Sequence, residues 1–336
     1  MNDGWRRVDA AFLQRAPTCG SHRKRMNRIF TAMTNLPWAS DKYKSSGQEG
    51  SVDVPGGALR YRLAGPVAAE DVVVFESGWS ASYPYGVWLE EALSPHARVL
   101  CYDRMGVGDS RGSAPLTPAG MTQQLTALLS SLGIRQSVVV AGHSYGGLIA
   151  ALHAAQAATT VRAIVQIDPT PEFDHELIDP SYRILPLMAR FMQLCALLKI
   201  DGPVFLHTAN ELPPEIFARM KRTPTWLARS LNGSIAEIRL LQEIRQIVTT
   251  SGAARRCPRL VISCDPQQAV DSWMRKLVIN DAKVGMYWDA VHALHKRQAS
   301  LSNASRWMSL PSNHVSLITS RLSAHRIAAH ILEFIR

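Results

Sequence analysis

The chain has 336 residues, 46% of them hydrophobic, and its 37 lysines and arginines exceed its 27 acidic residues to give a net charge of +10. This length suits one large α/β domain with an insertion, or two ordinary domains, and the apolar fraction excludes a wholly disordered chain. No apolar run reaches the roughly 18 residues of a transmembrane helix. The N-terminus lacks the apolar core of a secretory signal, so we expect a cytoplasmic protein.

The five cysteines are odd in number and widely scattered. This pattern fits neither a disulfide framework nor a zinc ribbon, so we expect reduced thiols.

The positive charge is concentrated at the two ends of the chain. The net charge is +5 over residues 1–50, −2 over residues 51–252 and +7 over residues 253–336. No nucleic-acid-binding motif accompanies this excess, so we expect no nucleic-acid partner.

Residues 1–50 are predicted to form a basic N-terminal extension and linker. Within them, the stretch 24–38 (KRMNRIFTAMTNLPW) places apolar residues at helical spacing after a basic start. Such a helix could make weak contact with an anionic membrane surface, or pack on the protein body. Pro37 and the polar run after it indicate a linker.

From residue 51, short strands alternate with helical segments. The strands are expected at 51–54, 58–63, 72–75, 98–102, 137–141, 162–167, 259–263 and 306–310. The later ones are nearly continuous Val- and Ile-rich runs, as in strands that are buried on both faces of a parallel sheet. Helices are expected at 84–94, 117–132, 145–158, 270–279, 285–301 and 320–335. The sequence therefore predicts an α/β fold with a mainly parallel sheet of about eight strands flanked by helices.

Residues 171–255 interrupt this alternation. They show no convincing strand, but they contain apolar helical stretches at 181–200, 213–222 and 234–249. We expect a helical cap, or lid, inserted between two parts of one core, residues 51–170 and 256–336. Its Leu, Met and Phe content predicts a face toward an apolar substrate, although these residues could simply pack on the core.

The strongest local motif is Gly142-His143-Ser144-Tyr145-Gly146, which follows a strand and begins a helix. This strand–turn–helix setting is what a Gly-x-Ser-x-Gly nucleophile elbow needs. Gly142 and Gly146 would allow close backbone approach without side chains, and Ser144 would project above the sheet. We predict that Ser144 is a nucleophile.

A serine hydroxyl needs a base within hydrogen-bond reach. His314 follows the last strand and precedes the last helix, so it would reach the same sheet edge as Ser144. His292, His295 and Asp289 share a helical face that could mimic a metal site, but further ligands are not evident, and we predict no metal.

The histidine in turn needs a carboxylate. Asp168 and Asp265 each stand directly before a proline, at the end of a strand. Asp265 occupies the sheet position that more often supplies this acid, but we favour Asp168 by a narrow margin, and both remain candidates.

An acyl-transfer site also needs backbone donors for the oxyanion. The N–H groups of Tyr145, just after the nucleophile, and of Trp79, in the loop after strand 72–75, are the candidates. Their side chains are expected to line the mouth of the pocket.

The order FESGW, CYDRMGVGDS, AGHSYGG, QIDPTPE and then Asn313-His314 resembles the α/β-hydrolase superfamily, and within it the esterase- and lipase-like members with a helical cap. The resemblance spans about residues 51–336. Glu76-Ser77-Gly78 departs from the usual His-Gly of the oxyanion loop, and Asn313 replaces the glycine that commonly precedes the histidine. The resemblance implies that the loop Asp103–Ser110 is structural.

These observations predict a serine hydrolase that cleaves an ester, thioester or related acyl bond of a small, partly apolar substrate, without a cofactor. Acyl transfer, lactone or C–C hydrolysis and cofactor-free haloperoxidase chemistry use the same residues. A non-catalytic binder of small molecules on the same fold is the alternative from another class.

Overall fold

The computed structural model describes residues 43, 47–112, 116–157, 160–198, 211–216, 224–265 and 281–336. All of them belong to one unit of the chain, residues 42–336. The predicted helix at 270–279 and the stretch 24–38 lie outside the described residues.

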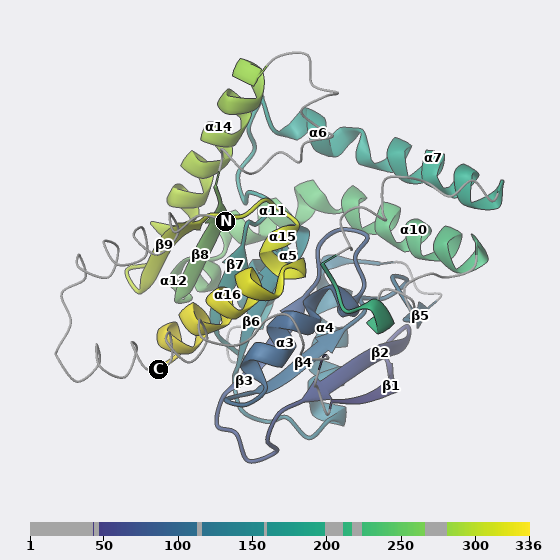
Figure 1. Ribbon diagram of the computed structural model, residues 1–336, viewed down its shortest axis with the longest axis vertical. Coiled ribbons are helices and arrows are strands. Elements are labelled where there is room, and N and C mark those ends of the chain that lie inside the picture. The colour runs from purple at the N-terminus through teal and green to yellow at the C-terminus, as the bar shows by residue number, and fades with distance from the viewer. Residues whose placement is uncertain are drawn as a thin grey trace, which may run out of the picture. The chain divides into compact units, whose positions relative to one another are not determined.

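A nine-stranded sheet forms the centre of this unit (Figure 1). Its strands are β1 (Gln48–Val54), β2 (Gly57–Ala64), β3 (Val72–Glu76), β4 (Arg98–Tyr102), β5 (Arg111–Gly112), β6 (Val138–His143), β7 (Val161–Ile167), β8 (Arg259–Cys264) and β9 (Ser305–Leu310). The order is β1-β2-β4-β3-β6-β7-β8-β9, and β5 pairs with β2. Strands β4, β3, β6, β7, β8 and β9 are parallel, whereas β2 is antiparallel to β1, β4 and β5. The predicted α/β fold with a mainly parallel sheet is therefore confirmed.

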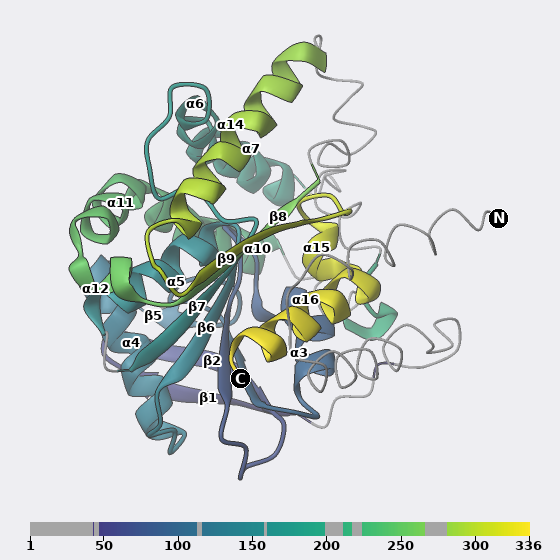
Figure 2. The ribbon, with the colours of Figure 1, turned by 90° about the vertical axis from the view of Figure 1, so that its left-hand side faces the viewer.

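Helices cover both faces of the sheet. They are η1 (Tyr83–Gly86), α3 (Val87–Leu93), α4 (Pro118–Ser131), α5 (Tyr145–Gln156), α14 (Asp281–Ala299), α15 (Ser316–Thr319) and α16 (Arg321–Phe334). Figure 2 shows the sheet between α3 and α16 on one side and α4 and α5 on the other. The alternation within β3 agrees, because Val73 and Phe75 pack with the first pair and Val72 and Val74 with the second. Each central strand is thus buried on both faces, which explains its continuous apolar sequence.

Helix α4 illustrates how the sequence sets an element boundary. Thr117 is its N-cap: its backbone is extended, and its Oγ1 accepts a hydrogen bond from the Gly120 N–H at 3.0 Å. Pro118 follows at the first helical position, where a missing N–H costs nothing.

Between β7 and β8 in sequence, the described residues form five helices. They are α6 (Asp179–Arg183), α7 (Leu185–Leu197), α10 (Pro224–Arg239), α11 (Leu241–Thr250) and α12 (Gly252–Arg256). The helix expected at 234–249 is in fact two helices, which meet at Leu240, and α10 begins ten residues earlier than the expected helix. We call residues 171–255 the cap segment.

No described helix is both long enough and apolar enough to cross a membrane.

Candidate active site

Ser144 lies at the sharp turn between β6 and α5. Its φ is 55° and its ψ is −121°, and residues other than glycine rarely adopt a positive φ. Two hydrogen bonds hold the turn: the Ser144 N–H donates to Ile167 O at 3.0 Å, and Ser144 O accepts from the Gly147 N–H at 2.9 Å. Because the surrounding backbone fixes the strained residue, its side chain leaves the end of the sheet in a set direction.

The two motif glycines allow this turn to pack closely. A Cβ on Gly142 would lie 2.0 Å from Gly146 O, and one on Gly146 would lie 2.2 Å from Glu76 O. Real Cβ atoms do not tolerate such distances, so both positions need glycine for close approach rather than for a positive φ. Gly146 lets α5 pack directly against the end of β3.

His314 lies after β9, and its imidazole reaches Ser144. The distance from His314 Nε2 to Ser144 Oγ is 3.1 Å, and that from His314 Nδ1 to Asp168 Oδ2 is 2.5 Å. A carboxylate only accepts, so Nδ1 carries the hydrogen, and Nε2 is left with a lone pair that accepts from the Ser144 hydroxyl. Asp168 and Ser144 thus meet His314 at the edge of the sheet where the parallel strands end, although they are 146 and 170 positions away from it in sequence.

Of the two candidate acids, Asp168 is the one that the structure places against His314. Asp168 follows β7 with a φ of 43°, and its Oδ1 accepts from the Cys264 N–H at 3.0 Å. Asp265 follows the neighbouring β8, and its N–H donates to Ser312 O at 3.2 Å.

Asp168 is held in its ionised form. Its side chain is buried, and burial alone would raise the pKa of a carboxyl group. The hydrogen bond and charge of His314, together with the charge of His295 and the Cys264 N–H, instead lower the pKa of Asp168 well below its usual range. The carboxylate is therefore negative at any pH where the imidazole could accept a proton.

His143, the neighbour of Ser144, contacts His314 through a hydrogen bond and through its ring. Its Nε2–H donates to His314 O at 2.8 Å, and the two ring centroids are 4.7 Å apart. Burial and the adjacent His314 lower the pKa of His143 to about 3. His143 therefore stays neutral and does not oppose a positive charge on His314.

The loop after β3 lies beside the turn that carries Ser144. A Cβ on Gly78 would lie only 3.4 Å from Ser144 Cβ. Gly78 O accepts from Arg104 Nη2 at 3.1 Å and from the Ala81 N–H at 3.2 Å. The Gly78–Trp79 peptide is trans, as are all peptide bonds of the described residues. In a trans peptide the C=O and the N–H point in opposite directions, so the Trp79 N–H points away from Arg104 and Ala81. Tyr145 is the first residue of α5, and its N–H has no partner within the helix.

Arg104 links this loop to the cap segment. Its guanidinium donates to Ser77 O at 2.6 Å and to both carboxylate oxygens of Glu237 in α10, at 2.5 and 3.1 Å. It also contacts Glu76 Oε2 at 3.3 Å. Burial opposes the charge on Arg104, but these carboxylates raise its pKa above the ordinary value. The sequence analysis placed Arg104 in a loop expected to be structural and did not predict these contacts. Its position in the Asp103–Ser110 motif was the only signal for it in the sequence.

Glu76, the departure from the usual oxyanion loop, lies beneath that loop. Its carboxylate is fully buried and accepts from Tyr102 Oη and, at 3.0 Å, from His153 Nε2. Burial would raise its pKa, but His153, Arg104 and Tyr102 together lower it. Glu76 is therefore a buried anchor for the loop.

Helix α10 is fastened to the core next to Ser144. Trp79 Nε1 donates to Ser234 O and Tyr145 Oη to Glu237 O, both at 2.7 Å. Arg229 adds hydrogen bonds to Ser110 O and Gly108 O. The Tyr145 side chain is only 1% exposed, so it anchors α10 and does not line an open pocket mouth as expected.

The loop Asp103–Ser110 is held by its own polar groups. Asp103 Oδ1 accepts from the Tyr83 N–H at 2.7 Å, Asp103 Oδ2 accepts from the Asp109 N–H at 2.8 Å, and Ser110 Oγ donates to Asp103 O at 2.6 Å. Its role through these contacts is to shape the backbone.

His292 and His295, which share a helical face, form hydrogen bonds with backbone and side-chain oxygens. His295 Nε2 donates to Pro169 O at 2.8 Å, and its Nδ1 lies 2.8 Å from Ser263 Oγ. His292 Nε2 donates to Cys264 O at 2.7 Å.

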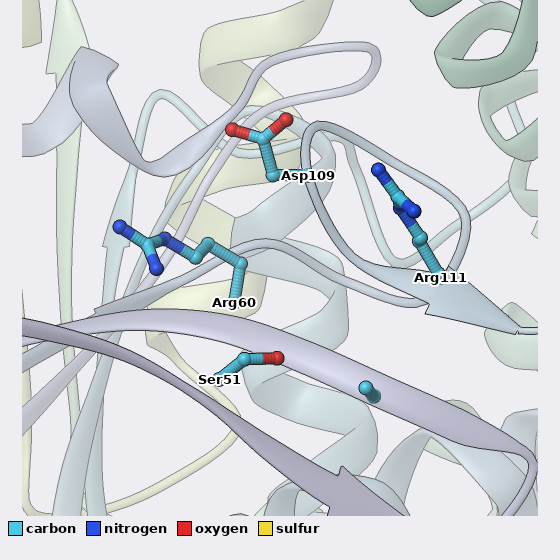
Figure 3. A pocket seen from close by; sticks show the side chains of 5 residues that line it. Ser51, Arg60, Asp109 and Arg111 are labelled. Carbon is cyan, nitrogen blue, oxygen red and sulfur yellow. The ribbon is translucent and has the colours of Figure 1, made fainter.

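A separate cavity of about 380 Å³ lies at the antiparallel end of the sheet (Figure 3). It is lined by Ser51, Ala58, Arg60, Asp109 and Arg111. Arg60 is already paired with Glu49 at 2.6 Å. None of these residues belongs to the Ser144 site.

Comparison with known proteins gives the class. A model of the alpha/beta hydrolase family matches residues 73–303, more than half of the chain. The chain belongs to this family.

Individual relatives align with a shorter part of the chain than the family model does. The mouse sn-1-specific diacylglycerol lipase ABHD11 is 35% identical over 130 residues, which are 38% of this chain and 42% of that protein. The homoserine O-succinyltransferase of Xanthomonas campestris is 32% identical over 125 residues, which are 32% of this chain and 33% of that protein. The chain thus matches less than half the length of these curated relatives.

Solved structures match the fold over a longer stretch. The enol-lactonase of Burkholderia xenovorans is 18% identical, with a TM-score of 0.56 over 85% of this chain and 99% of that one. At this identity the likeness supports the fold alone.

Proposed function

We propose that the protein is a serine hydrolase that cleaves an acyl ester through an acyl-enzyme. The observation that carries this proposal is the chain of hydrogen bonds from Ser144 Oγ through the His314 ring to Asp168 Oδ2, at 3.1 and 2.5 Å. The family membership and the strained turn at Ser144 support it.

In the first step, Ser144 Oγ attacks the carbonyl carbon of the ester while His314 Nε2 takes its proton. Asp168, already ionised, stabilises the imidazolium. The tetrahedral oxyanion is bound by the N–H groups of Tyr145 and Trp79. The intermediate collapses when His314 returns the proton to the leaving alkoxide, which departs as the alcohol.

In the second step, His314 takes a proton from water, and the hydroxide attacks the acyl-enzyme. Collapse of this intermediate gives the carboxylic acid and restores the Ser144 hydroxyl. His143 lies beside the imidazolium, and its low pKa keeps it neutral throughout. The cycle needs no metal or organic cofactor.

An ester with an apolar acyl part is the substrate class that we favour. The mouse relative is named as a lipase of diacylglycerol. The bacterial relative is named as an acyltransferase, and transfer differs from hydrolysis only in that an alcohol replaces water as acceptor.

A panel of p-nitrophenyl esters of increasing acyl length tests the proposal. Ser144→Ala should lower turnover at least about 10⁴-fold, because the nucleophile is lost. Ser80→Ala is the matched control: Ser80 also has a positive φ, 61°, and lies in the neighbouring loop, yet it has no role in the mechanism. Equal turnover by wild type and Ser144→Ala would favour the non-catalytic binder. Ester product formed with an added alcohol would instead favour acyl transfer.

A further inference from the structure

The outer face of α7 exposes large apolar side chains. Each of six is more than a third exposed: Leu187 (73%), Phe191 (65%), Leu198 (61%), Leu194 (53%), Ile184 (53%) and Met188 (39%). At about 100° per residue, these positions fall within an arc of about 120°. Four of these residues lie in α7, and Ile184 and Leu198 flank it directly; we call all six the outer face of α7.

The opposite side of α7 packs on α10 and the core. Ala189 is fully buried against Leu231 and Ile235 of α10. Gln193 Nε2 donates to Ala228 O at 2.8 Å and to Asn232 Oδ1 at 2.9 Å. Met192 packs on the same cluster, and Leu185 packs against the core. Within Leu185–Leu197 only Arg190 and Gln193 are polar, so α7 is apolar on its exposed side as well as on its packed side, whereas a surface helix normally exposes a polar side.

Helix α7 is held in place through α10. It packs on α10, which Trp79, Tyr145 and Arg104 bind to the core beside Ser144. In Figure 1, α7 lies beyond α10 as seen from the sheet. The outer face therefore belongs to the layer of the cap segment that is farther from the sheet.

The charges near the outer face are positive. Arg183 and Arg190 lie about 80° and 100° from its middle, along one edge. The segment Leu185–Leu197 contains no acidic residue. The acceptors that Arg190 binds are the amide oxygens of Gln193 and Asn232, which leave its charge in place. An apolar arc with cations along its edge is typical of helices that lie in the interface of an anionic membrane.

We propose that the outer face of α7 docks on an anionic lipid surface, and that the cap segment thereby presents Ser144 to acyl esters held in that surface. The second half of this inference rests on the proposed function. The first half does not, because it follows from the exposure and charge of α7 alone.

Vesicle flotation of the full chain tests the docking. Wild type should float with phosphatidylcholine vesicles that contain phosphatidylglycerol, and less with phosphatidylcholine alone. The double variant Leu187→Gln/Phe191→Gln should lower the partition coefficient at least about 10-fold, because it removes the two most exposed apolar side chains of the face. Val67→Gln, which changes an equally exposed residue in the β2–β3 loop, should float like wild type.

Two results would overturn the docking proposal. If the double variant floats like wild type, another part of the chain binds the lipid. If wild type does not float but elutes as a dimer that the double variant dissociates, a second copy of the chain covers the face.

A turnover assay separates this inference from the proposed function. All three proteins should hydrolyse soluble p-nitrophenyl acetate equally, whereas the double variant should hydrolyse dioleoylglycerol embedded in the vesicles about 10-fold more slowly. No soluble turnover by any of them would refute the hydrolase, while flotation would still decide the docking. Equal turnover of the embedded ester would refute the presentation of lipid to Ser144.

Discussion

Replacing Arg104 with lysine tests how the loop that carries Trp79, the proposed oxyanion donor, is held. The guanidinium donates to five acceptors: the two carboxylate oxygens of Glu237, Glu76 Oε2, Ser77 O and Gly78 O. An ammonium group keeps the charge but has only three N–H donors and no fixed plane. At least two of the five acceptors therefore lose this donor.

The magnitudes follow from that count. Each buried acceptor left without a donor costs about 1–3 kcal/mol, so the loss of two should lower the free energy of unfolding of Arg104→Lys by about 2–6 kcal/mol. If Gly78 O loses the Arg104 donor, the Ala81 N–H alone still holds it, and the Gly78–Trp79 peptide can rotate. The Trp79 N–H, the proposed oxyanion donor, is then displaced. Removing one such donor lowers kcat by about 10²–10³, and displacing it should lower kcat about 10–100-fold with little change in KM.

Steady-state turnover of p-nitrophenyl butyrate and urea unfolding measure the two effects separately. Arg259→Lys is the matched control, since Arg259 is also buried and binds Glu172 and Ala254 O. It begins β8, at the opposite edge of the sheet from Ser144. The control should lose stability but keep kcat. A folded Arg104→Lys protein with the kcat of wild type would refute the reasoning.

Three further predictions follow from the site. Asp168→Asn should lower kcat about 10⁴-fold, whereas Asp265→Asn should stay within a few-fold; the reverse order in ester turnover would assign the acid to Asp265. Gly146→Ala puts a Cβ 2.2 Å from a backbone oxygen and should cost at least about 1–3 kcal/mol in urea unfolding. Gly285→Ala, in open space within α14, should instead stabilise by up to about 1 kcal/mol, and equal effects would contradict this account. Asp103→Asn should flatten the pH dependence of unfolding between about pH 4 and 7.

The sign of the last effect comes from the pKa of Asp103. Burial raises that pKa to about 7, against the hydrogen bonds from the N–H groups of Asp109 and Tyr83. The folded state then holds a proton that the unfolded state releases near pH 4, so this contribution to stability is present below about pH 4 and lost by about pH 7. Its slope is up to about 1.4 kcal/mol per pH unit. An unchanged slope in Asp103→Asn would contradict a raised pKa.

The parallel core could be read from the sequence because its signals are local. Runs such as Val72–Phe75 are apolar at every position, and each expected strand corresponds to a strand of the structure. Strand β5 was missed because it has only two residues and no pattern of its own. Helix α10 was expected to begin at 234 but begins at Pro224, and Leu227 and Leu231 already share the helical spacing of Ile235.

The contacts that shape the candidate site are long-range, and no local pattern specifies them. Asp168 and Asp265 both follow strands that end at the same sheet edge, so their spacing in sequence could not separate them. The hydrogen bond from Trp79 Nε1 to Ser234 O joins residues 155 positions apart. The sequence located Trp79 and Tyr145 next to the nucleophile, but only the packed structure shows that their side chains hold α10.

Intact-protein mass spectrometry after treatment with a fluorophosphonate tests the central claim most directly. The reagent phosphonylates a serine only where a base activates its hydroxyl and an oxyanion site receives the phosphoryl oxygen. Wild type should gain one adduct that maps to Ser144, while Ser144→Ala should gain none and His314→Ala should react far more slowly. An adduct that forms equally on Ser144→Ala, or maps to another residue, would contradict the assignment of the nucleophile.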